Sequence, residues 1–216
     1  MRLWSFNVVR SATDKPLVSV DVKGDTRLLT PEQVVAQLLR HVKVGAEAHL
    51  DTSVEGVVIT CPAAFTSAQR EALHAAATMA GLRVLRLLDE PIAAALAIIG
   101  DTPNVLKPAK QDIPRAVVIF NIGGGSCDAC FMEVDQGVLE AKATVASTVV
   151  SGEAFDARLV YHLAELFERA TALKPLTSRK ATQRLRLAAS KAKELLSTSE
   201  EARVRSAPAS CLPASC

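Results

Sequence analysis

Apolar and polar residues recur with two different periods along this chain, and the changes of period mark the elements that we predict. Short apolar runs rich in valine and isoleucine are typical of buried strands, and the clearest are GVVIT at 56–60 and AVVIF at 116–120. Longer stretches with apolar residues three or four positions apart predict helices. The most regular is Pro31–Leu50, whose predicted buried face consists of Val34, Val35, Leu38, Leu39 and Val42.

Two of the predicted helices begin with the same signature. Thr30 is followed three residues later by Gln33, and Thr66 is followed by Gln69 in the same way. This spacing predicts a capping box, in which each side chain satisfies a backbone N–H group of the other residue. The second helix should end before Gly81, because glycine readily takes the left-handed conformation that often follows a helix.

The remaining elements follow from the same two periods. Further strands are predicted at 6–9, 17–22, 82–88, 126–134 and 138–149. Further helices are predicted at 66–80, 153–170 and 177–196. The helix at 153–170 should bury Phe155, Leu159, Leu163 and either Leu166 or Phe167. Residues 91–99 (PIAAALAII) are apolar on all sides and are therefore expected to form a buried helix.

Composition narrows the classes of function. The chain has 216 residues, a formal net charge of +2 and 49% hydrophobic residues. A nearly neutral charge gives no electrostatic argument for nucleic acid or an anionic membrane, so neither is expected as a partner. The most apolar run, Ile92–Ile99, is far shorter than the ~20 residues of a membrane-spanning helix, and the first residues lack the pattern of a secretory leader. We therefore expect a cytoplasmic protein.

The five cysteines include one spaced pair, Cys127 and Cys130. The C-x-x-C spacing is found in redox and zinc sites, where it lies in a turn or at a helix start. Here it falls inside a predicted strand, and side chains three residues apart in a strand point to opposite faces. Two ordinary sheet cysteines are therefore favoured over a redox or metal site.

Candidate chemistry gathers around three glycines. Gly123–Gly125 lie between two predicted strands, so the tip of the hairpin is backbone without Cβ atoms, and its N–H groups could bind a phosphate. Asn121 and Asp128 flank the tip, where polar groups could hold the water shell of a metal. The alternative is a glycine turn that only reverses the chain. Glu90 lies between a predicted strand and helix, either contacting a ligand or serving as a carboxylate favoured by the helix dipole.

Several long motifs, in one order, resemble the heat shock protein 70 chaperones. The segment that resembles the crossing between the two lobes of their ATPase domain is VVITCPAAFTSAQREALHAAATMAGLRVLRLLDEPIAAALA. The hairpin IFNIGGGSCD resembles their second phosphate loop, SGEAFDARLVYHL a Gly-Gly-Glu-Asp-Phe-Asp helix start, and LRLAASKAKELLSTS the helix that holds adenosine. LWSFNVV and KGDTRLLTPEQVVAQLL also match in order, so the resemblance runs from about Leu3 to about Arg205.

The resemblance implies an α/β fold of the actin-like ATPase (ribonuclease H-like) type, incomplete, with two partial lobes. On this basis we expect five segments. They are a remnant of an outer lobe-one segment (1–30), a lobe-one α/β segment (31–103), a lobe-two hairpin sheet with the phosphate loop (104–150), a lobe-two helical segment with the adenosine helix (151–205) and a disordered tail (206–216). The proline-containing stretch Asp101–Pro114 is expected to be a linker or loop.

The resemblance also implies a nucleotide site with ATP and Mg²⁺ as cofactors. The residues implied to contact phosphate are Gly123, Gly124, Gly125, Ser126 and Gly152. The residues implied in catalysis are Glu90, Asn121 and Asp128, of which Glu90 and Asp128 would hold the metal through water. The residues implied to contact adenosine are Ser190, Lys193, Glu194 and Ser197.

The chain departs from the family pattern at several of these positions. Asn121 replaces the first aspartate of the phosphate hairpin and removes one charge, while Ser126 replaces threonine and keeps the hydroxyl. Ser151 replaces the first glycine of a pair. Ser190 stands where the family has glutamate, and Glu194 where it has an arginine that stacks on adenine. Loss of a cation over an aromatic ring costs about 0.5–2 kcal/mol.

The implied function is that of an ATP-binding chaperone that folds proteins, with unfolded client proteins and co-chaperones as partners. The first phosphate loop and a cleft lysine of the family have no counterpart in the sequence, so we expect that the chain alone is not a competent ATPase. The alternative is a degenerate relative without turnover, acting as a protein-interaction module or without function. A sugar kinase or actin fits less well, because the segment at 90–95 and the adenosine helix match the chaperones specifically.

Overall fold

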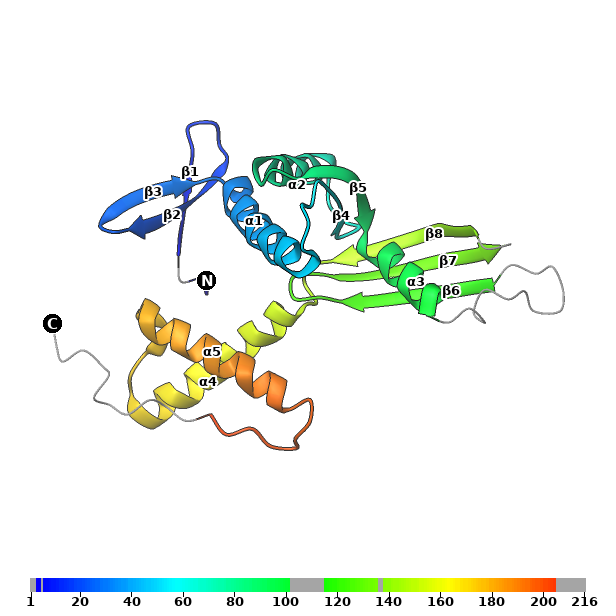
Figure 1. The fold of residues 1–216 in the computed structure, drawn as a ribbon. Coiled ribbons are helices and arrows are strands. Elements are labelled where there is room, and N and C mark those ends of the chain that lie inside the picture. Colours follow the sequence, from blue (N-terminus) through cyan, green and yellow to red (C-terminus); the bar gives the residue numbers. More distant parts are fainter. Residues whose placement is uncertain (1–2, 5, 102–114, 136–137, 205–216) are drawn as a thin grey trace. The chain divides into compact units, whose positions relative to one another are not determined.

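The computed structural model describes residues 3–4, 6–101, 115–135 and 138–204 (Figure 1). The described residues form a mixed α/β structure that divides into two compact units. One unit comprises residues 6–152 and holds three small sheets with three α-helices, and the other comprises the described residues of 1–5 and 153–216 and is helical. The predicted loop Asp101–Pro114 is wrong at Asp101, which is helical, and its remaining residues, 102–114, lie outside the described residues. Residues 136–137 and the predicted tail at 206–216 also lie outside them.

The first sheet is an antiparallel meander of β1 (Asn7–Arg10), β2 (Pro16–Val22) and β3 (Asp25–Leu29). Strand β3 is an addition to the predicted elements. Lys23 and Gly24 connect β2 to β3 with φ angles of 54° and 92°. Positive φ at both central residues is the requirement of a two-residue hairpin turn whose twist matches the flanking strands.

Helix α1 (Pro31–Leu50) begins with the predicted capping box. The Gln33 backbone N–H donates to Thr30 Oγ1 at 3.2 Å, and the Thr30 N–H donates to Gln33 Oε1 at 2.9 Å. Farther along the helix, the Arg40 side chain donates to the Met79 carbonyl oxygen at 3.1 Å, and the Lys43 side chain donates to the Gly81 carbonyl oxygen at 2.9 Å. These bonds satisfy acceptors at and just beyond the end of α2 (Ser67–Met79).

The predicted buried face of α1 is wrong in part. Ala36 is buried, and Leu39 packs against the cluster of Ala77, Ala80 and Leu82. The other predicted residues are half-buried (Val35) or exposed (Val34, Leu38 and Val42). The apolar stripe is wider than the surface that α2 and the adjoining sheet present to it, so only part of the stripe is covered.

The second sheet pairs β4 (Gly56–Cys61) and β5 (Arg83–Asp89) in parallel, with α2 as the connection between them. The second capping box is present, since the Gln69 N–H donates to Thr66 Oγ1 at 3.3 Å and the Thr66 N–H donates to Gln69 Oε1 at 2.9 Å. Gly81 follows the helix with φ of 74°. Val57, Ile59 and Val84 pack under α2, whereas Val58 and Leu85 on the opposite face are more than half exposed.

The third sheet is antiparallel, in the order β6 (Arg115–Ile122), β7 (Cys127–Asp135) and β8 (Val138–Ser147). Helix α3 (Glu90–Asp101) lies along it (Figure 1). Ala95 of α3 forms a core with Ile119, Cys130 and Met132 of the sheet, and further apolar residues join it: Ile92, Ala94, Val117 and Leu139. This face of the sheet is the covered face.

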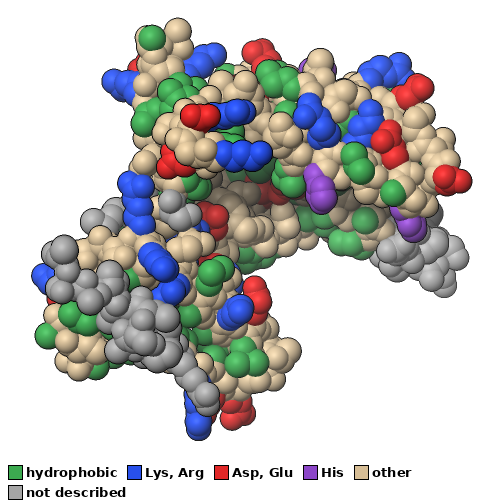
Figure 2. All heavy atoms as spheres, turned by 60° about the vertical axis from the view of Figure 1, so that its left-hand side comes forward, with side chains coloured by type: hydrophobic (Ala, Val, Ile, Leu, Met, Phe, Trp, Pro, Cys, Tyr) green, Lys and Arg blue, Asp and Glu red, His purple; other side chains and the backbone are tan. Residues whose placement is uncertain are grey.

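The other face of the same sheet is open within the described residues. Val118, Phe120, Ile122 and Val145 are 67%, 65%, 49% and 72% exposed. The expectation that α3 is buried on all sides is also wrong, because Leu96 is 49% exposed. Only the side of α3 that meets the sheet is covered. Apolar side chains are accordingly visible at the surface between charged ones (Figure 2).

The helical unit pairs α4 (Gly152–Thr171) with α5 (Arg179–Leu195), and a short 3-10 helix, Pro175–Thr177, lies between them. Val160, Ala164 and Ala189 are buried. The expected buried face of α4 is wrong at Phe155, which is 51% exposed. Of the two alternatives farther along the helix, Leu166 is 47% exposed and Phe167 is half-buried. Small residues near the middle of each helix form the buried centre instead. No helix of the described residues is long and apolar enough to cross a membrane.

Candidate functional site

The glycine hairpin is closed by backbone bonds. The Gly123 N–H donates to the Ser126 carbonyl at 2.8 Å, and the Gly152 N–H donates to the Gly123 carbonyl at 3.0 Å. A Cβ atom on Gly124 or Gly125 would meet no other heavy atom within 4 Å. Packing within the chain therefore does not require glycine at these positions. Open space beside bare backbone suits the close approach of a ligand.

Three predicted polar residues meet at the base of this hairpin. Asn121 and Asp128 are register partners on β6 and β7. Asn121 lies two residues after Ile119, and Asp128 lies two residues before Cys130. Because side chains in a strand alternate between faces, Asn121 and Asp128 are on the covered face with Ile119 and Cys130. Glu90 is the first residue of α3, and Asn121 Nδ2 donates to Glu90 Oε2 at 3.2 Å. The helix that covers this face thus also brings its first carboxylate to the hairpin.

Asp128 is the most constrained member of this group, because its side chain is completely buried. Ser126 Oγ donates to Asp128 Oδ2 at a long 3.4 Å. Its other oxygen, Oδ1, has no hydrogen-bond partner among the described residues. Burying a charged oxygen without a partner is costly, and such atoms are rare. An unsatisfied oxygen of this kind points to a bound cation, water or donor.

The electrostatics of the pair also suit a cation. Burial raises the pKa of Glu90, and the negative charge of Asp128 raises it further, while the hydrogen bond from Asn121 opposes the shift. Carboxylate oxygens are the ligands of Mg²⁺, which usually keeps several waters. The described residues contain no group of three or more His, Cys, Asp or Glu side chains that could hold a metal. The two carboxylates, one of which has an unsatisfied oxygen, fit a hydrated Mg²⁺ held through water.

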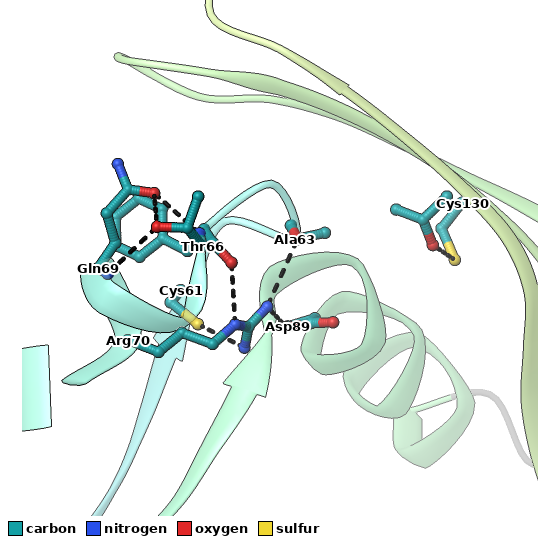
Figure 3. Close-up of polar contacts among 9 residues, drawn as sticks. Cys61, Ala63, Thr66, Gln69, Arg70, Asp89 and Cys130 are labelled. Atoms are coloured by element: carbon teal, nitrogen blue, oxygen red, sulfur yellow. Dashed lines mark hydrogen bonds and ion pairs between the residues drawn. The ribbon is translucent and has the colours of Figure 1, made fainter.

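A partly buried arginine fixes the strand ends that lead to Glu90 (Figure 3). Arg70 of α2 forms an ion pair with Asp89 at 2.7 Å and donates to the Cys61 sulfur at 3.2 Å. It also donates to the carbonyl oxygens of Phe65 and Ala63. Burial raises the pKa of the Cys61 thiol. This cluster was not predicted from the sequence, although an arginine one residue after the capping box and an aspartate at a strand end were signals for it.

The predicted adenosine residues belong to the helical unit. Ser190, Lys193 and Glu194 lie on α5 at helical spacing, and Ser197 follows its last turn. Lys193 Nζ contacts Asp156 Oδ1 of α4 at 2.7 Å. The ammonium group is therefore held in place by a carboxylate that the sequence analysis did not single out. Ser190 is half-buried, and Glu194 and Ser197 are exposed.

The cysteine pair follows the interpretation as two sheet residues. Cys130 is buried on the covered face, where Thr144 Oγ1 donates to its sulfur at 3.2 Å, and Cys127 is half-buried. Both are free thiols. Because β7 is extended at both positions, their side chains point to opposite faces of the sheet.

Comparison with known proteins places this chain in a family. The family described as Hsp70 protein matches residues 1–214. The chain belongs to the Hsp70 family. This membership confirms the resemblance noted above and the actin-like ATPase fold that it implies, of which the mixed α/β structure is a part.

The relatives are named heat shock proteins. Heat shock cognate 70 kDa protein 3 of Dictyostelium discoideum is 38% identical over 205 residues, which is 94% of this chain and 32% of that protein. Heat shock 70 kDa proteins of Neurospora crassa and Emericella nidulans are 38% and 39% identical over 201 residues, each covering 93% of this chain and 30% of the relative. The chain thus spans about a third of the length of these relatives.

Proposed function

We propose that this protein is an ATP-binding chaperone of the Hsp70 type, and that Gly123–Ser126 with Gly152 forms its phosphate cradle. The observation that carries the proposal is the combination of open glycine backbone with the unsatisfied buried oxygen of Asp128. A phosphate would accept hydrogen bonds from the backbone N–H groups of the tip. Family membership supports the nucleotide as ATP and the metal as Mg²⁺.

In this proposal Glu90 and Asp128 hold the water shell of the metal, and Asn121 keeps the Glu90 carboxylate in position through its amide. When bound, Mg²⁺ would neutralise charge on the phosphates. Ser190, Lys193, Glu194 and Ser197 would contact adenosine, and Asp156 would orient the Lys193 ammonium. Residues 31–103 would belong to the first lobe and 104–205 to the second.

At the level of the cell, we propose hydrolysis of ATP to ADP and phosphate coupled to the folding of client proteins, with co-chaperones, in the cytoplasm. One observation favours the alternative of a relative that does not turn over. The amide at position 121 is neutral and is engaged with Glu90, where a third charge would otherwise face the metal. Loss of a preorganised group of this kind costs on the order of 10²–10³ in rate.

A calorimetric titration with Mg-ATP tests the cradle. We expect the 216-residue chain alone to bind more weakly than micromolar and to hydrolyse no faster than background. Gly124→Ala with Gly125→Ala should leave folding unchanged, since their Cβ atoms meet nothing, and should lower affinity roughly tenfold or more by obstructing the phosphate. Gly45→Ala on α1 is the matched control, because its Cβ would also meet nothing.

Two results would contradict these expectations. A micromolar dissociation constant would contradict the expected weak binding of the chain alone, although it would support ATP as the ligand. Equal affinity for Mg-ATP in the parent and in the variant with Gly124→Ala and Gly125→Ala would show that the hairpin does not cradle phosphate, whatever the strength of binding.

A further inference from the structure

Asn121 contacts one carboxylate and faces a second one across the sheet. It faces Asp128 across the β6–β7 register and donates its amide N–H to Glu90 at 3.2 Å. Asp128 is completely buried and has one oxygen without a partner among the described residues. Two acidic side chains are therefore held near each other on the covered face, with one neutral donor beside them.

Close, partly buried carboxylates repel each other unless a donor or a cation stands between them. The amide of Asn121 supplies a partial positive charge at this point, and it adds no negative charge of its own. An aspartate of the same shape would remove the donor and bring a third negative charge to the cluster. That arrangement would require an external cation.

We propose that the Asn121 amide takes the place of a cation beside Glu90, so that the hairpin and α3 stay packed together without a bound metal. The Asp128 oxygen that has no partner among the described residues stays available to the metal of the proposed function. The inference concerns the site of the proposed function, and it rests on that function only for the identity of the metal. Its test uses no nucleotide, so its failure is distinguishable from failure of the ATP cradle.

The experiment measures the melting temperature of the chain by circular dichroism, in EDTA and in millimolar Mg²⁺. We expect the parent to melt within about 1 °C in the two buffers, because no cation is needed. Asn121→Asp should melt about 5 °C or more lower than the parent in EDTA and should regain most of that loss in Mg²⁺, because a cation that binds the folded state stabilises it.

Two further variants sharpen the test. Asn7→Asp makes the same chemical change on the exposed strand β1 and should show no dependence on Mg²⁺. Adding Glu90→Gln to Asn121→Asp restores two carboxylates and one amide, so stability in EDTA should return, even if the single variant does not fold.

The proposal is overturned by any of three results. The first is a parent that needs Mg²⁺ for its stability. The second is an Asn121→Asp variant that is equally stable in both buffers. The third is a failure of both Mg²⁺ and Glu90→Gln to restore the loss.

Discussion

The two faces of the β6–β7–β8 sheet have similar apolar content and different surroundings. On the covered face, α3 packs against Ile119 and Met132, and the polar pair Asn121 and Asp128 continues the same rows toward the glycine tip. On the open face, Phe120 and Val145 flank Ala129 in one row across the sheet and are more than half exposed.

The difference shows how one helix can serve structure and chemistry together. Helix α3 buries the apolar rows of one face, and its first residue, Glu90, thereby reaches the end of the hairpin. The open face has equally apolar strands and no described helix over it. Its ion pairs, from Lys142 to Glu133 and Glu140, lie at the end of the sheet away from the glycine tip. Strands that are apolar on both sides are typical of sheets covered on both faces.

The largest effect should come from the core of the covered face. Met132→Ala is expected to lower the free energy of unfolding by about 2–5 kcal/mol, because it deletes a fully buried side chain and leaves a cavity. Chemical denaturation measures this. Val145→Ala on the open face should cost less than about 1 kcal/mol, since that side chain is 72% exposed. Similar losses for the two variants would mean that the open face is covered in solution.

Association should depend on the open face. Exposed apolar rows and sheet edges bind other chains, so we expect the chain to associate and to bind a hydrophobic dye. Phe120→Lys with Val145→Lys should shift it toward monomer and reduce dye fluorescence several-fold, as checked by size-exclusion chromatography with light scattering. The control is Leu28→Lys with Leu38→Lys, which adds the same charge at exposed positions outside the open face. A parent that is already a monodisperse monomer would contradict the expectation.

The sequence was informative where structure is local. Strand and helix periods placed most elements, and the capping boxes at Thr30 and Thr66 are present, because each needs only residues within one turn. Strand β3 was not predicted, because its sequence DTRLL is short and begins with polar residues. The periods also predicted which residues share a face of a helix. They did not predict how much of that face the neighbouring elements cover. For that reason Leu38 and Leu96 were expected to be buried and are exposed.

The same limit applies to the candidate site. The closeness of Asn121 and Asp128 follows from a hairpin, and the position of Glu90 at a strand end marks it as a candidate ligand contact. The pairs Arg70–Asp89 and Lys193–Asp156 were not predicted, because each joins elements distant in sequence and depends on packing. The roles of the site residues toward a nucleotide stay predictions.

The smallest expected effect is the pH dependence of the stability that Glu90 contributes. This effect tests where the covered face ends. The pKa of Glu90 is raised above the ordinary value of 4.5 in the folded chain. The folded state therefore holds this proton more tightly than the unfolded state does. The resulting stabilisation is fully present below the unfolded pKa and is lost as the pH rises through the folded pKa.

Glu90→Gln removes this titration while its amide oxygen can still accept the bond from Asn121. Urea denaturation between acidic and neutral pH should therefore show the variant gaining stability relative to the parent as the pH rises, with the difference levelling above the folded pKa. Glu71→Gln, at an exposed position on α2, measures the general effect of losing one carboxylate. Parallel pH profiles for Glu90→Gln and the parent would show that Glu90 is solvated like a surface residue. The covered face would then end before the hairpin, at Ile119 and Cys130.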